Sequence, residues 1–115
     1  MIRRLRRQAQ PTKPIDPAID ARFGELMDLT ASIAGRLEGN KLAGDDYEKF
    51  YNDMAQASLG WTWLSENGYF LEISEPYASA ISSIIAGFDS HQDVLVRDGL
   101  ATIIRVADDI TKRNH

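Results

Sequence analysis

The most restrictive feature of this sequence is a spacing of apolar residues by three and four positions that recurs in separate segments. In the first segment, apolar residues and one threonine recur over positions 19–37 at spacings of 4, 3, 4, 3 and 4. Similar patterns cover positions 47–64, 77–88 and 96–110. Because an α-helix has about 3.6 residues per turn, each pattern places an apolar stripe along one helix face. The chain is therefore predicted to form four amphipathic helices that bury these stripes against one another.

Local signals predict where the first two helices begin and end. Asp16 followed by Pro17 is a helix-start signal, because the carboxylate accepts a backbone hydrogen bond and proline is tolerated in the first turn. Gly39 is expected to end this helix. Asp45 is expected to start the second helix, with Glu48 completing an arrangement that resembles a capping box. The short loop between them favours an antiparallel helix pair.

The second half of the chain has weaker boundary signals. Gly68 is expected to close the second helix, and residues 69–73 are interpreted as an extended connector. Ser74 is expected to cap a third helix that ends at Phe88. The polar segment 89–93 then supplies another start signal, and basic residues in the last turn of the fourth helix complement its dipole.

These patterns together predict an all-α fold. We expect a compact four-helix, bundle-like single domain over residues 16–115, preceded by an extended basic arm over residues 1–15. At 115 residues the chain is long enough to bury one hydrophobic core. The residues predicted to form this core are Phe23, Leu26, Ile33, Phe50, Met54, Trp61, Ile81, Ile84, Leu100, Ile103 and Ile110.

Charge is distributed unevenly along the chain. Residues 1–14 hold five of the thirteen basic residues and no acid, whereas the remainder carries eight basic residues against seventeen acids. Three prolines lie within residues 11–17, at the end of the arm and the start of the first predicted helix, which places the arm outside the predicted core. The candidate contact residues of the arm are Arg3, Arg4, Arg6 and Arg7, which would contact phosphate, an acidic protein surface or anionic lipid. A solvated tail is the alternative interpretation.

Two tryptophans lie two positions apart in the second predicted helix, so a single buried face cannot hold both. Trp61 belongs to the apolar stripe and is interpreted as a core residue. Trp63 points elsewhere, beside Leu59 and the unusual helical glycine Gly60. Either this helix is buried on two sides, or Leu59, Gly60 and Trp63, joined by Phe70, form an apolar interface with another protein.

Residues able to support catalysis or metal binding are sparse. The chain has no cysteine and two histidines, and no catalytic residue, metal site or cofactor is predicted. Asp89, His91 and Asp93 are interpreted as capping and solvated residues, because alternate positions entering a helix do not converge on one metal ion. The start of the chain does not resemble a signal peptide and no apolar run is long enough to span a membrane, so a cytoplasmic location is expected.

The sequence therefore favours a non-enzymatic protein-interaction protein, such as an assembly component, an adaptor or a small inhibitor. It would act through an apolar helix face and its basic arm, and bind a protein partner or its own copy, with a two-fold dimer favoured. The alternative is a nucleic-acid-associated regulator that uses the arginines of the arm for phosphate contacts. Phosphate binding would weaken steeply with added salt, whereas an apolar interface would not.

Overall fold

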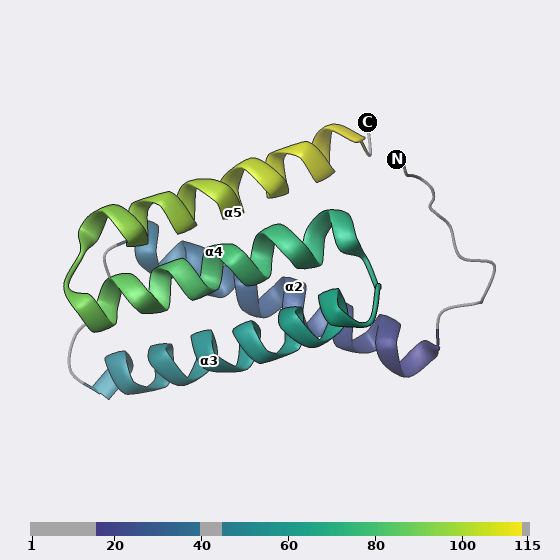
Figure 1. Ribbon diagram of the computed structural model, residues 1–115, viewed down its shortest axis with the longest axis horizontal. Coiled ribbons are helices and arrows are strands. Elements are labelled where there is room, and N and C mark those ends of the chain that lie inside the picture. Colours follow the sequence, from purple (N-terminus) through teal and green to yellow (C-terminus); the bar gives the residue numbers. More distant parts are fainter. Residues whose placement is uncertain (1–15, 40–44, 114–115) are drawn as a thin grey trace.

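Four α-helices make up the part of the protein that the computed structural model describes, residues 16–39 and 45–113 (Figure 1). They are α2 (Pro17–Glu38), α3 (Asp45–Glu66), α4 (Leu71–Ser90) and α5 (Asp93–Arg113). None of these described residues belongs to a strand, and the all-α prediction is confirmed. The predicted arm lies outside the described residues, so its boundary at residue 15 stays a prediction.

Consecutive helices run antiparallel, so that the four helices close into a bundle (Figure 1). Each helix packs against its neighbours in the chain, and the last helix, α5, also packs against α2. The α4–α5 pair has the most extensive contact and the α2–α5 pair the least. The helices therefore form a ring whose closing seam, between the first and last helices, is its loosest.

The predicted stripes meet in the middle of this ring. Eight of the eleven predicted core residues are buried, and the other three, Phe23, Leu100 and Ile110, are partly buried against them. The buried set is Leu26, Ile33, Phe50, Met54, Trp61, Ile81, Ile84 and Ile103. Amphipathic spacing thus identified the inward faces of all four helices.

Trp61 is the largest fully buried side chain, and its polar atom is satisfied inside the core. The indole Nε1–H donates to Thr30 Oγ1 at 2.8 Å, and the Thr30 hydroxyl donates in turn to the Leu26 carbonyl at 2.7 Å. The buried threonine therefore serves as both acceptor and donor, which avoids the cost of an unpaired indole N–H.

Four of the predicted helix boundaries are found, since α2 follows Asp16 and ends before its C-cap Gly39, and α3 begins at Asp45 and ends just before Gly68. Asp16 caps α2, with its carboxylate accepting from the Ala18 backbone N–H at 2.8 Å. At the end of α3, Gly68 adopts a left-handed conformation with φ of 79°. The Tyr69 N–H donates to the Leu64 carbonyl at 2.8 Å, and the Gly68 N–H donates to Ser65 at 3.1 Å. This pair of bonds is the Schellman motif, which satisfies carbonyls that the helix end leaves free.

The predicted connector over residues 69–73 and the predicted cap at Ser74 are wrong. Helix α4 begins at Leu71, directly after Phe70, which adopts a left-handed conformation with φ of 52°. The Phe70 carbonyl accepts the N–H groups of both Ile73 and Ser74, so the first turn forms without a side-chain cap. Ser74 is buried inside this helix, and its hydroxyl donates to the Tyr69 carbonyl at 2.9 Å.

The α4–α5 pair approaches closely because glycines lie at its contact points. A Cβ atom on Gly99 would lie 2.5 Å from the Ala80 carbonyl oxygen, and one on Gly87 would lie 2.9 Å from the Gln92 carbonyl oxygen. Real Cβ atoms do not approach backbone atoms to such distances. The absence of side chains at these two positions therefore sets the spacing of the pair with the largest contact.

We expect Gly99→Ala to destabilise the fold, whereas Gly35→Ala stabilises it. The new methyl group at position 99 would push α5 away from α4, at an overpacking cost of about 1–3 kcal/mol. Gly35 is also helical, but nothing lies within 4 Å of its Cβ position. There, the better helix propensity of alanine is worth about 0.5–1 kcal/mol. Urea unfolding of both variants measures the difference, and equal stability of the two would contradict the assigned close contact.

Candidate functional site

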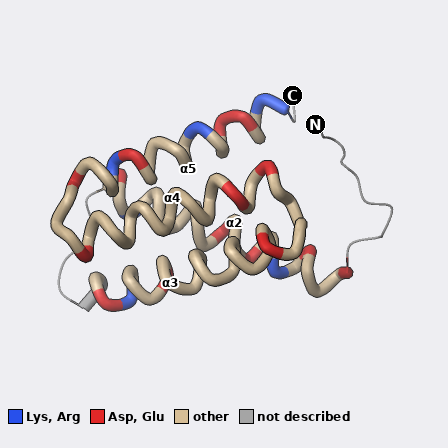
Figure 2. The backbone as a smooth tube through the Cα atoms, viewed as in Figure 1, with Lys and Arg blue, Asp and Glu red and all other residues tan. Residues whose placement is uncertain are grey.

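The outer face of α3 carries two exposed apolar side chains in an uncharged stretch. Residues 54–65 contain no Lys, Arg, Asp or Glu, and Figure 2 shows the middle of α3 without charge. Leu59 is 69% exposed and Trp63 is 50% exposed. Because they lie four positions apart on one helix, their side chains are neighbours on the same face. Both of them therefore lie outside the core.

The Trp63 ring is held in place by the turn that ends α3. It stacks on the Tyr69 ring with a centroid distance of 6.0 Å and an interplanar angle of 13°. Tyr69 follows the left-handed Gly68. An apolar contact between the residue after such a glycine and the last turn of the helix, here between Tyr69 and Trp63, commonly accompanies the Schellman motif. The Trp63 carbonyl also accepts the Asn67 side-chain amide at 2.8 Å. We call Leu59, Trp63 and Tyr69 the Trp63 surface.

Gly60 and Phe70, the other two predicted interface residues, contact α2 of the same chain. Gly60 is buried, and a Cβ atom there would lie 2.5 Å from a terminal methyl carbon of Leu26. Phe70 is partly buried, and its ring stacks on Phe23 at a centroid distance of 4.1 Å. The structure thus brings Leu59 and Trp63 together on the surface and gives Gly60 and Phe70 intramolecular contacts.

Sequence reasoning missed Tyr69 as a member of this surface. The signal was present in Gly68, because a left-handed glycine at a helix end predicts a contact between the residue after it and the last turn. That rule pairs Tyr69 with Leu64 or Trp63. The tyrosine was instead assigned to an extended connector, where no such contact is expected.

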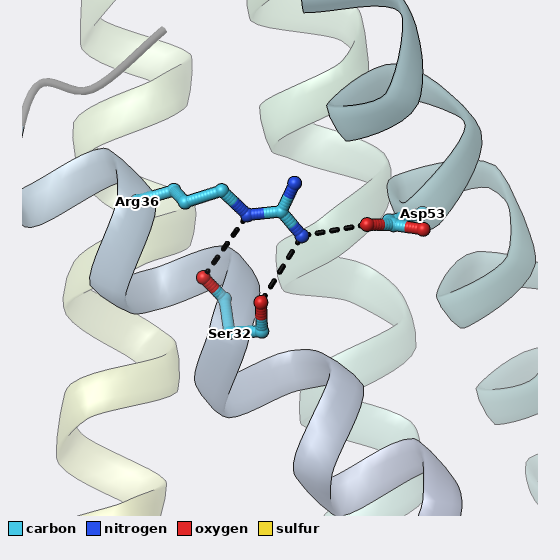
Figure 3. Close-up of polar contacts among 3 residues, drawn as sticks. All are labelled: Ser32, Arg36 and Asp53. Carbon is cyan, nitrogen blue, oxygen red and sulfur yellow. Dashed lines mark hydrogen bonds and ion pairs between the residues drawn. The ribbon is translucent and has the colours of Figure 1, made fainter. Parts of the chain in front are cut away.

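An ion pair fastens the seam between α2 and α3 (Figure 3). The Arg36 guanidinium donates to Asp53 Oδ2 at 2.6 Å and to Ser32 Oγ at 3.1 Å. It also lies 5.1 Å from the centroid of the Phe50 ring. The side chains of the pair are only 21% and 22% exposed, which strengthens the attraction relative to a fully solvated pair. The contact fixes α3 against α2 and neutralises the last acid before the uncharged stretch.

A second polar contact joins α3 to α4. The Tyr51 hydroxyl donates to the two carboxylate oxygens of Asp89, at 2.9 and 3.1 Å. This hydrogen bond to a carboxylate raises the pKa of Tyr51 above its usual value, because it stabilises the neutral phenol. The polar contacts of α3 therefore hold it against both of its neighbours and leave its outer face free.

Other functional groups are sparse in the described part of the chain. No group of three or more His, Asp or Glu residues there is arranged to hold a metal ion, and no described helix is long and apolar enough to cross a membrane. His91 is exposed in a left-handed conformation where α4 ends. The predicted arm contacts Arg3, Arg4, Arg6 and Arg7 lie outside the described residues.

Comparison with known proteins supplies no relative from which to transfer a role. No protein-family model, curated protein sequence or solved structure matches the chain. Function is therefore inferred from the side chains of this chain alone, and the Trp63 surface is the arrangement among the predicted site residues that the structure brings together.

We expect the two tryptophans to differ sharply in their effect on stability. Trp61→Ala should cost about 3–5 kcal/mol, because removal of the fully buried indole leaves a cavity and takes away the N–H that Thr30 Oγ1 accepts. Trp63→Ala should cost about 1 kcal/mol or less, mainly through the lost stack on Tyr69. Chemical denaturation of both variants tests the assignment. Similar losses of free energy in the two variants would show that Trp63 belongs to the folding core.

Proposed function

We propose that the chain is a non-enzymatic protein-interaction protein that binds its partner through the Trp63 surface. The observation that carries this proposal is a half-exposed tryptophan, fixed by its stack on Tyr69, beside a leucine that is 69% exposed. Tryptophan is enriched at interface hot spots because it buries a large area and has few rotatable bonds. Its fixed orientation lowers the entropy lost on binding.

The surroundings of the Trp63 surface also support binding to another protein. Charged groups are costly to remove from water, and the outer face of α3 has none over residues 54–65. Interface cores show the same depletion of charge and the same enrichment in large aromatic residues. The surface therefore combines an apolar anchor with a low desolvation cost.

The partner that fits this surface best is a second copy of the chain in a two-fold dimer. Two identical surfaces face each other across a two-fold axis, so any charge on them would oppose a like charge nearby. The chain as a whole has a formal net charge of −4, and two copies repel each other in most orientations. The uncharged stretch of α3 over residues 54–65 reduces this repulsion, since apolar Leu59 and Trp63 would meet their own counterparts there.

Light scattering across a range of concentrations tests this proposal with Trp63→Asp and a matched control. We expect the wild type to self-associate and Trp63→Asp to remain a folded monomer, because each interface would bury an added carboxylate. Val94→Asp places the same charge on an apolar residue of α5 that is 59% exposed, and should associate as the wild type does. If wild type and Trp63→Asp are equally folded monomers and capture the same partners from native cells, this surface is not the interface.

The basic arm is proposed as a second binding element, and deletion of residues 1–13 tests it. We expect the melting temperature of the monomer to change little, because the arm is predicted to lie outside the core. Binding to a partner should weaken, and more so at low salt, because five positive charges are removed. The alternative role in nucleic-acid binding predicts that the full chain binds duplex DNA or RNA with a steep salt dependence that the deletion abolishes. Unfolding of the shortened chain would place the arm in the core.

A further inference from the structure

A groove of about 420 Å³ lies between α2 and α5, where the helix ring closes most loosely. Its walls come from one row of side chains on each helix. Met27, Ala31 and Ala34 line it from α2, and Ile103, Ile104 and Ala107 line it from α5. Alanines on both helices leave the space that larger side chains would fill. The groove is therefore an apolar slot open to solvent along one side of the bundle.

The lining of the groove includes Tyr77, whose hydroxyl has no hydrogen-bond partner among the described residues. Tyr77 reaches it from α4 and is only 2% exposed, with its ring packed edge-on against Trp61 at a centroid distance of 5.2 Å. A tyrosine phenol is protonated at neutral pH and is therefore a donor, and burial raises the pKa of Tyr77 further. A buried donor without an acceptor is costly, and an acceptor brought into the groove removes that cost.

The rim of the groove disfavours anions. Its charged members are the acids Glu38 and Asp108, and Asp108 is already paired with Lys112 at 3.1 Å. The Thr111 hydroxyl, also at the rim, donates to the Ala107 carbonyl at 3.0 Å. The rim therefore offers an entering molecule no unpaired cation with which to bind a carboxylate or phosphate.

We propose that this groove binds an uncharged, mainly apolar small molecule whose carbonyl or ether oxygen accepts a hydrogen bond from Tyr77. The volume lies within the usual range for small-molecule sites, and such sites combine an apolar lining with few polar groups. A partner helix fits less well, because its backbone carbonyls are already paired within the helix and do not reach a donor on the floor. The groove lies on α2 and α5, so this inference does not depend on the Trp63 surface.

Titration of the full chain with two matched fluorescent probes tests the proposal. Prodan is an uncharged dimethylaminonaphthalene with one ketone oxygen, and the second probe is the same ring system without the ketone. We expect saturable binding of prodan with emission shifted to shorter wavelength. Tyr77→Phe should weaken prodan binding about three- to tenfold, the value of one hydrogen bond, and leave the ketone-free probe unaffected. Loss of affinity for both probes alike, or for neither, would overturn the role of the hydroxyl.

Filling variants locate the binding site. Ala107→Phe and Ala31→Phe place a ring in the groove from either wall and should abolish binding of both probes. Ala101→Phe, at an exposed position on α5 outside the groove lining, should bind as the wild type does. Thermal melts confirm that each variant is folded, and having one filling variant on each helix guards against a single misfolded protein. Prodan binding that never saturates, that survives both filling variants, or that disappears as the chain self-associates at higher concentration would overturn the proposal.

Discussion

The buried indole of Trp61 is the contact on which the rest of the structure depends. Its N–H donates to Thr30 and its ring packs edge-on against Phe23, both from α2, and against Tyr77 from α4. One side chain of α3 thus joins three of the four helices. Because the hydrogen bond restricts its orientation, it also fixes which side of α3 faces inward.

The outward position of Trp63 follows directly from this constraint. Residues two positions apart on a helix point about 200° apart, so burying Trp61 turns Trp63 toward solvent. An exposed tryptophan on a smooth helix would sample several rotamers, and ordering it on binding would cost entropy. Here the left-handed Gly68 reverses the chain and places Tyr69 against the indole. The turn that ends α3 therefore also prepares its surface for binding.

The sequence predicted the parts of this fold that depend on local pattern. Spacing by three and four identified the helices and most of the core, and the predicted cap at Asp16 is formed. The start of α4 was mispredicted, because it depends on Phe70, whose ring stacks on Phe23 from a helix far away in sequence. The role of Gly60 was likewise hidden, since a glycine in a sequence does not show which side chain approaches it. In this chain that side chain is Leu26.

The groove between α2 and α5 could not be predicted from any single helix, because it depends on the spacing of all four. Gly87 and Gly99 let α5 approach α4 closely, and Gly60 lets α3 approach α2. Close approach at these two of the four seams does not close the seam between α2 and α5, which stays open unless larger side chains fill it. The residues facing that seam include alanines on both helices, so the space remains open above Tyr77. Glycines thus permit close packing at two seams of the bundle, while alanines leave a binding-sized space at the seam between α2 and α5.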